Sequence, residues 1–103
     1  MGAIVYGGGE RRISLQDRTL AHVKSVVIAK LRRQESFTLS FPVVDGEGGK
    51  RVALWIHPSI PLQFEFDEIA RPELNRAWLN DLMVSANASG DLRIDEEPVA
   101  AVA

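Results

Sequence analysis

The chain offers two imidazoles, His22 and His57, and no cysteine, so ligands for zinc are scarce and thiolate nucleophiles are absent. A structural zinc site needs about four nitrogen or thiolate ligands, and a lone imidazole needs a partner to act as a general base. Asp67 and Glu68 could offer oxygens to magnesium, but solvated loop surface explains them more simply. We therefore predict no metal site, no cofactor and no catalytic residue.

Two glycine-rich stretches have some features of phosphate-binding loops. Residues 48–51 read GGKR, but Val44 stands where the first glycine of such a loop belongs and Arg51 stands where a Ser or Thr would meet magnesium. The stretch also leads into a strand pattern, so it offers no helix N-terminus to a phosphate. Residues 7–9 lie between two short apolar runs and are predicted to form a hairpin turn.

The first candidate recognition surface lies on the polar side of the predicted strands. Strand alternation places Ser40, Trp55, His57 and Glu65 opposite the apolar positions. An exposed Trp beside a His suggests a partner site or a dimer interface. A deep pocket lined by His57, Ser40 and Glu65 would instead indicate a small ligand, whereas a flat patch around Trp55 would indicate protein association.

The second candidate surface is a basic helix face that carries Arg18, His22, Arg32 and Arg33. Such a face could meet the phosphates of a nucleic acid or an acidic partner. The formal net charge of -2 gives the whole protein no general attraction to nucleic acid, so an ordinary solvated helix face is the simpler interpretation.

Two amphipathic helices are predicted to pack against the strands. Residues 17–33 place Leu20, Val23, Val27 and Leu31 on one apolar stripe, with Asp17 as the predicted N-cap. Residues 71–88 form a second amphipathic pattern. There Pro72 suits the first helical position and Gly90 follows the end. Asn75 lies near the apolar side of this helix and is expected to bond a backbone group, in the turn at residues 58–61.

The remaining pattern predicts strands at residues 3–6, 10–15, 37–43, 51–57, 62–66 and 91–95. The order β-β-α-β-β-β-α-(β) with short connections predicts an α+β fold, with one mainly antiparallel sheet of five to six strands and two helices on one face. The three middle strands should form an antiparallel meander. Residues 1–95 are expected to be a single domain and residues 96–103 a frayed tail.

Composition limits the cellular setting of this 103-residue chain. The absence of cysteine suits a reducing compartment, and no segment approaches the ~20 apolar residues of a membrane-spanning helix. The N-terminal apolar run is too short for a signal peptide and no basic residue precedes it. We therefore expect a soluble cytoplasmic protein.

Three blocks of the chain resemble a family of short uncharacterised bacterial proteins, and together they cover nearly its whole length. The blocks are DRTLAHVKSVVIAKLRRQESFTLSF, ALWIHPSIPLQFEFD and RPELNRAWLNDLMVSANASGDLRI. Members of that family often carry the automatic label "ATP-dependent DNA ligase". The resemblance brings no catalytic residues with it.

The ligase label can be tested on the residues. Ligases of that class attach AMP to the lysine of a Lys-x-Asp-Gly motif, but neither Lys24, Lys30 nor Lys50 is followed by x-Asp-Gly. Val43 occupies the lysine position ahead of the one Asp-Gly pair, and the chain is short for a two-domain ligase. We therefore predict a non-enzymatic protein-interaction module. Its partner could be another protein or a second copy of the chain, which would give a homodimer. A nucleic-acid-associated accessory protein is the alternative.

Overall fold

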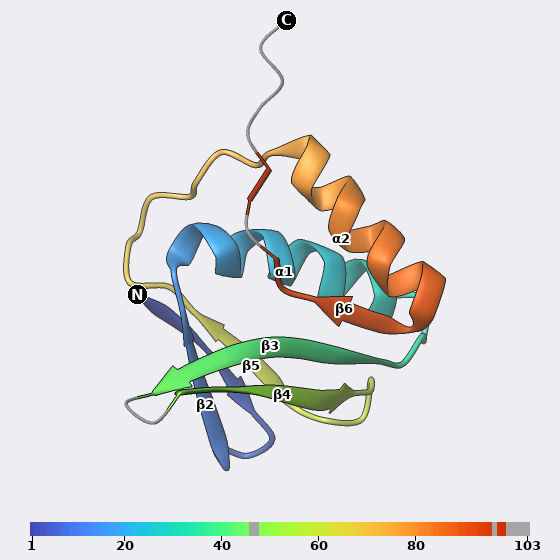
Figure 1. Ribbon diagram of the computed structural model, residues 1–103, viewed down its shortest axis with the longest axis horizontal. Helices are drawn as coiled ribbons and strands as arrows, with labels where there is room; N and C mark the ends of the chain where they lie inside the picture. Colours follow the sequence, from blue (N-terminus) through green and yellow to red (C-terminus); the bar gives the residue numbers. More distant parts are fainter. Residues whose placement is uncertain (46–47, 96, 99–103) are drawn as a thin grey trace, which may run out of the picture.

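The computed structural model describes residues 1–45, 48–95 and 97–98. The fold is α+β, and its elements follow the predicted order (Figure 1). The elements are β1 (Gly2–Tyr6), β2 (Arg11–Leu15), α1 (Asp17–Leu31), β3 (Phe37–Asp45), β4 (Gly48–Ile56), β5 (Leu62–Glu65), α2 (Arg76–Ser89) and β6 (Asp91–Arg93). Among the described residues, no helix has the length and apolar character needed to cross a lipid bilayer.

The strands form two three-stranded sheets where a single sheet was predicted. The β1 sheet has the order β2-β1-β5 and is antiparallel throughout. The β3 sheet has the order β4-β3-β6, in which β6 runs parallel to β3. The predicted meander is correct for β3 and β4 but wrong at its last step, because β5 leaves β4 and pairs with β1.

The chain changes sheets in the short connection between β4 and β5. Pro58 and Pro61 have no N–H group, so this segment is poorly suited to extend a ladder beside β4. The carbonyl of Pro61 accepts a hydrogen bond from the N–H of Gly7 at 3.0 Å. This contact brings the following strand alongside β1.

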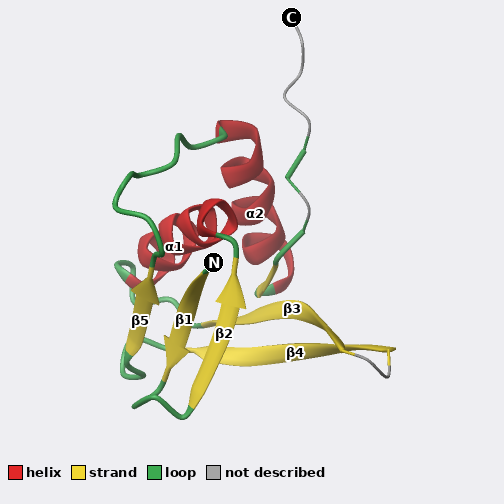
Figure 2. Cartoon of the chain, turned by 90° about the vertical axis from the view of Figure 1, so that its left-hand side faces the viewer, coloured by secondary structure: helices red, strands yellow, loops and turns green. Residues whose placement is uncertain are grey.

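Helix α1 presents the predicted apolar stripe to the rest of the molecule. Leu20, Val23 and Val27 are fully buried, and Leu31 packs against the same core. Burying one Val or Leu side chain stabilises a fold by about 1.5–3 kcal/mol, so this stripe is a main source of stability. Both helices lie on the same side of the strands, as Figure 2 shows.

Asp17 has a different role from the predicted N-cap. Gln16 occupies the N-cap position without a side-chain hydrogen bond, and Asp17 is the first helical residue. The Asp17 carboxylate accepts hydrogen bonds from the backbone N–H groups of Asp67 (3.1 Å) and Glu68 (3.0 Å). These two bonds tie the start of α1 to the segment after β5 and hold the pKa of the Asp17 carboxyl below its ordinary value.

Helix α2 begins at Arg76, so the predicted start at Arg71 is wrong. Pro72 was assigned to the first turn, but Asn75 is the N-cap and the residues before it are not helical. An Asn cap stabilises a helix start by satisfying free N–H groups, which a proline at the first position does not do. The end of α2 is as predicted, with Gly90 in the left-handed conformation (φ 72°).

Lys30 is a buried cation that joins the two helices. Its amine donates to Asn87 Oδ1 on α2 at 2.8 Å and forms an ion pair with Glu35 at 2.8 Å. The aliphatic part of the side chain lies in the core, while the charged amine contacts these two polar partners. Lys30 therefore fixes the contact between α1 and α2.

Gly2 lies where the start of β1 leaves no room for a side chain. A Cβ there would meet the Glu65 carbonyl oxygen, a Leu20 methyl group and Asp17 Oδ1. We expect Gly2→Ala to lower the free energy of unfolding, measured by urea denaturation, by about 1–3 kcal/mol because of this overpacking. An added Cβ at Gly8 meets nothing within 4 Å, so Gly8→Ala is the control and should cost less than about 0.5 kcal/mol. Equal losses in the two variants would contradict the steric explanation.

Candidate functional site

The four side chains predicted to share one recognition surface are divided between the two sheets. Trp55 lies on β4 with 52% of its surface exposed, and Ser40 lies on the adjacent strand β3. Glu65 belongs to β5 in the β1 sheet, where it pairs with Arg12. The prediction that all four lie on one sheet face is therefore wrong, because alternation along a strand does not show which strands are neighbours. Their role in binding stays a prediction.

Ser40 and His57 are both engaged in hydrogen bonds close to the β3 sheet. Ser40 is buried, and its hydroxyl donates at 2.6 Å to Asp91 Oδ1, which also accepts from Thr38 at 2.7 Å. The Nδ1 atom of His57 lies 2.7 Å from the Ser59 hydroxyl and accepts the Ser59 backbone N–H at 3.0 Å. Trp55 is thus the member of the set that lies exposed on an open sheet face.

The arginines of the predicted basic face do not form one cluster. Arg18 is in the first turn of α1, whereas Arg32 and Arg33 are exposed beyond its last turn. At 1.5 Å of rise per residue, the two ends lie about 21 Å apart along the helix axis. Arg18 is also held by other residues of the chain, so this helix face offers a nucleic acid or an acidic partner less available positive charge than the sequence suggests.

His22 was predicted on the surface, and that prediction is wrong. The imidazole is fully buried and stacks on Trp78, with 4.5 Å between the ring centroids. The backbone N–H of Asn75 can only donate, so Nε2 of His22, 2.8 Å away, must accept. Nδ1 then carries the proton and donates to the carbonyl of Arg18 at 2.7 Å. Both nitrogens are satisfied in this neutral form, which explains how a polar side chain is tolerated in the core.

Asn75 joins three segments of the chain. Its side-chain oxygen accepts from two N–H groups in the first turn of α2, at 3.1 and 3.3 Å. Its amide nitrogen donates to Glu97 Oε2 at 3.0 Å and to the carbonyl of Pro98 at 3.3 Å. The predicted bond from Asn75 to the turn at residues 58–61 is wrong, since its polar atoms are used at the helix start and by the C-terminal segment.

Glu97 and Arg18 form a bidentate ion pair. The Nε and Nη2 atoms of Arg18 donate to the two carboxylate oxygens at 2.6 Å each, while Nη1 donates to the carbonyl of Glu73 at 2.7 Å. The hydrogen bonds from Arg18 and Asn75 lower the pKa of the Glu97 carboxyl to about 2. Glu97 and Pro98 are the described residues of the segment 96–103 that was predicted to be a frayed tail.

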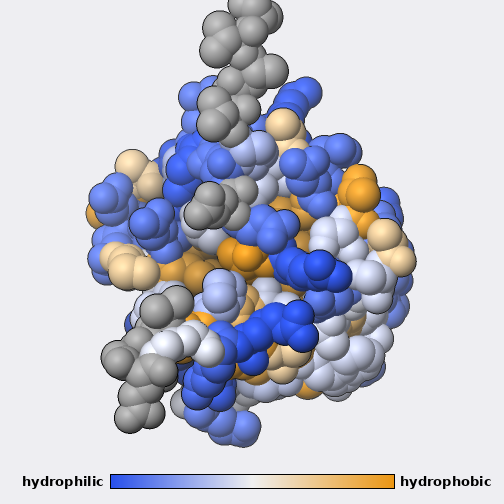
Figure 3. Space-filling view, viewed as in Figure 1, coloured by the Kyte–Doolittle hydropathy of each residue, from blue (hydrophilic) through white to orange (hydrophobic). Residues whose placement is uncertain are grey.

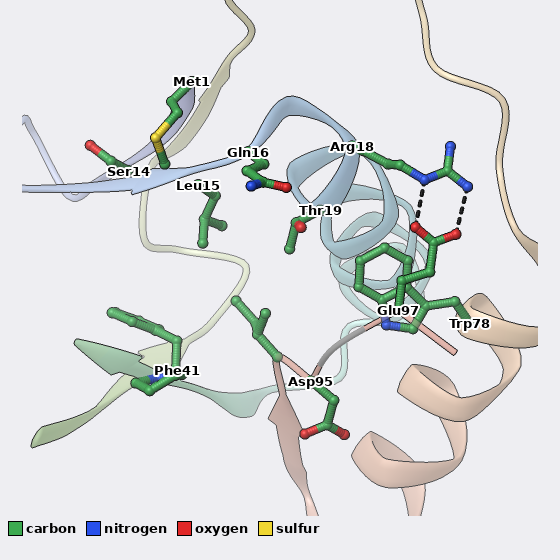
Figure 4. A pocket seen from close by; sticks show the side chains of 12 residues that line it. Met1, Ser14, Leu15, Gln16, Arg18, Thr19, Phe41, Trp78, Asp95 and Glu97 are labelled. Atoms are coloured by element: carbon green, nitrogen blue, oxygen red, sulfur yellow. Dashed lines mark hydrogen bonds and ion pairs between the residues drawn. The ribbon is translucent and has the colours of Figure 1, made fainter. Parts of the chain in front are cut away.

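A cleft of about 440 Å³ opens beside this ion pair (Figure 4). Leu15, Phe41, Trp78 and Ile94 contribute apolar surface to its lining. Figure 3 shows hydrophobic side chains between the hydrophilic rims of this face of the molecule. The volume lies within the range of roughly 300–1,000 Å³ that small-molecule sites occupy.

Beside this cleft, the side chain of Trp78 has one buried polar atom that lacks a hydrogen-bond partner in the described part of the chain. Its indole is 3% exposed, and Nε1 has no hydrogen-bond acceptor among the residues that the structure describes. A buried donor left unbonded costs about 1–3 kcal/mol, so such an atom calls for an explanation. In Figure 4 the indole nitrogen lies on the side of the ring that faces Asp95.

A second groove, of about 550 Å³, lies between α1 and the segment that precedes α2. Ile28, Ile69 and Leu74 line it and are exposed, and Lys24 and Arg71 add positive charge. Over the ranges 1–45, 48–95 and 97–98, no group of three His, Asp or Glu side chains is arranged to hold a metal ion.

Sequence reasoning missed the two side chains that characterise the cleft. Trp78 was placed on the apolar face of α2, where it is buried as predicted, but its position over His22 depends on how α2 crosses α1. Glu97 was assigned to the tail, and its partner Arg18 lies far away in the sequence. Asn75 could have been found as a cap, because Asn is among the preferred N-cap residues.

Replacing Asn75 tests the cap and its link to the C-terminal segment. We expect Asn75→Ala to lower the free energy of unfolding by about 1–2 kcal/mol, since two helix N–H groups lose their acceptor. Asn80→Ala, at an exposed position within α2, is the control and should change it by less than about 0.5 kcal/mol. Urea denaturation measures both values. A loss in the control as large as that in Asn75→Ala would rule out the capping role.

The Arg18–Glu97 pair should make stability depend on acidity. The carboxyl of Glu97 has an ordinary pKa of 4.5 and a folded-state pKa of about 2, so its contribution is fully present above about pH 4.5 and is lost as the pH falls towards 2. We therefore expect the stability difference between wild type and Glu97→Gln to shrink over that interval, in urea titrations at a series of pH values. Asp81→Asn, at an exposed position of α2, is the control. A difference that stays constant down to pH 2 would contradict the assignment.

Comparison with known proteins identifies the sequence family of the chain. A family model described as "Domain of unknown function (DUF7882)" matches residues 1–97, and this description carries no mention of ligase activity. No curated protein and no solved structure matches the chain significantly. The prediction of an uncharacterised family is confirmed, and nothing found here supports the ligase label. Because the match extends over nearly the whole chain, the protein belongs to the DUF7882 family.

Proposed function

We propose that the domain is a non-enzymatic interaction module that binds an acidic protein partner through the exposed face of the β3 sheet around Trp55. The observation that carries this proposal is the 52% exposure of Trp55 on an open sheet face. A small ligand needs a concave site that surrounds most of it, whereas a large exposed aromatic side chain on a sheet face is suited to contact with a protein surface.

Two arginines accompany Trp55 on this face. Arg51 lies four positions before Trp55 on β4, and this even spacing points both side chains to the same side of the pleat. Arg93 on β6 pairs with Ser40, which pairs in turn with Ala53 on β4, and laterally paired residues also share a face. Both arginines are exposed, and Arg93 forms an ion pair with Asp91 at 3.4 Å. Trp and Arg are enriched among the residues that dominate the binding energy of protein interfaces.

Asp91 lies on the same face and offsets one of the two arginines, so the face keeps a small positive excess, which suits an acidic partner better than a second copy of the chain. A two-fold interface brings the same patch of two molecules together, which would place Arg51 and Arg93 of one molecule near those of the other. A partner that offers a pocket for the indole of Trp55 with carboxylates around it has the complementary charge. The predicted homodimer is thus the less favoured form for this surface.

The outer edge of β4 is less suited to strand pairing than its face is to docking. The Tyr6 hydroxyl donates to the carbonyl of Trp55 at 2.7 Å and so occupies one end of that edge. Lys50 and Arg51 lie nearer the other end, and charged side chains on an edge discourage pairing with another strand.

Nucleic-acid association through α1 has less support. Arg18 is held by Glu97 and by the carbonyl of Glu73, and His22 is buried. Arg32 and Arg33 remain as an exposed pair, but the formal net charge of -2 does not favour a polyanion.

Trp55→Ala tests the proposal. A photoreactive amino acid at position 53, an exposed position on the same face of β4 that leaves Trp55 in place, identifies the contacting protein in the native cell, with position 69 as the control. That protein is then purified. We expect Trp55→Ala to weaken its binding at least about 30-fold, the effect of an interface residue worth about 2 kcal/mol or more. Ile69→Ala, which removes a fully exposed side chain elsewhere, should leave the dissociation constant unchanged.

Three outcomes would overturn this proposal. The first is a crosslinked protein whose purified form binds Trp55→Ala as tightly as the wild type. The second is a mass in sedimentation that rises with concentration and falls back to the monomer value in Trp55→Ala, which would favour the homodimer. The third is binding of single-stranded DNA or RNA that weakens steeply with salt and is lost in Trp55→Ala.

A further inference from the structure

We propose that the cleft beside Arg18 binds a small apolar carboxylate. The carboxylate group of the ligand takes the place of Glu97 on the Arg18 guanidinium, and its apolar body lies against Leu15, Phe41 and Trp78. This site is separate from the Trp55 face, so the proposal does not rest on the function proposed above.

The first argument is that a carboxylate already occupies the anion position. The two oxygens of Glu97 accept from Arg18 Nε and Nη2 at 2.6 Å each, the parallel geometry in which a guanidinium recognises a carboxylate. The third donor, Nη1, is bonded to the carbonyl of Glu73 at 2.7 Å, which orients the guanidinium independently of Glu97. A ligand therefore meets a cation that is already held in place.

The second argument is that Glu97 can be exchanged. The side chains of Arg18 and Glu97 are 43% and 29% exposed, so solvent and solutes reach the pair. Ion pairs with this exposure are partly screened by solvent. A ligand carboxylate that also buries an apolar group has an additional source of affinity that Glu97 lacks.

The third argument is the unpartnered donor of Trp78. Nε1 belongs to a residue that lines the cleft, and it has no acceptor among the described residues. Acceptors are available in a carboxylate ligand, which has two oxygens and can bond more than one donor. Nε1 itself is covered, so the side chains around it must shift before a ligand reaches it.

The charges around the cleft favour a singly charged ligand. Asp95 also lines the cleft, and Arg18 is the cationic side chain in its described lining, since the ammonium of Met1 is paired with Asp67. A phosphate monoester would bring close to two negative charges against one arginine and one aspartate, whereas a carboxylate brings one. The planar fork of an arginine also matches a carboxylate in two parallel hydrogen bonds.

The test uses 1-naphthaleneacetate as the probe and the two tryptophans of the chain as reporters. In a ¹H–¹⁵N spectrum of the full chain, each indole gives its own N–H signal. We expect the probe to shift the Trp78 signal in a saturable manner and to leave the Trp55 signal in place as an internal reference. The uncharged analogue 1-naphthaleneacetamide should bind at least about tenfold more weakly, because it cannot form the charged pair with Arg18.

Two substitutions give opposite expectations. Glu97→Gln removes the competing carboxylate and should tighten probe binding by about threefold or more. Arg18→Gln should weaken it by about tenfold or more, whereas Arg32→Gln at the other end of the helix, the matched control, should have no effect. Arg18→Lys keeps the positive charge but lacks the planar guanidinium, so we expect it to bind the probe with intermediate affinity. This variant serves as the test if Arg18→Gln fails to fold.

The proposal is overturned if the Trp78 signal does not respond to the probe, if the acid and the amide bind equally, or if Glu97→Gln binds no more tightly than the wild type. Equal binding by Arg18→Lys and wild type would also overturn it, because the paired geometry would then be irrelevant. None of these results bears on whether a protein docks at Trp55.

Discussion

The imidazole of His22 is fully buried and must find partners for both nitrogens within the protein, and the rest of the candidate site depends on how it does so. Nδ1 uses the carbonyl of Arg18 one turn earlier in α1, and Nε2 uses the N–H of Asn75. Because Asn75 is the N-cap of α2, its own N–H is not needed inside that helix. The hydrogen bond from Asn75 to His22 thus ties the start of the second helix to α1.

Further contacts follow from that placement. Trp78, in the first turn of α2, stacks on the same imidazole and lines the cleft. The side chain of Asn75 reaches the carboxylate of Glu97, which in turn meets Arg18 on α1. The cleft is therefore assembled by segments distant in sequence that are connected through His22 and Asn75.

The features that could be predicted from sequence are those with a local physical cause. The stripe of Leu20, Val23 and Val27 follows from the helical period, and the end of α2 follows from the positive φ that Gly90 supplies. The features that could not be predicted depend on distant partners. Alternation marks Phe64 and its neighbours as a strand, but it does not reveal that this strand pairs with β1. His22 reads as a surface residue until its acceptor and donor are known.

Each sheet is built around a strand whose two neighbours come from very different parts of the chain. In β1, Ile4 faces Ile13 on one side and Phe64 on the other, and in β3, Leu39 faces Leu54 and Leu92. The hairpins can form as soon as their own residues leave the ribosome, whereas the second edge of β1 waits for β5 and that of β3 for β6. Such pairing slows folding and leaves strand edges open to other chains in the interval. The period between synthesis of the hairpins and synthesis of the last strand is thus the time at which this small protein is most prone to aggregate.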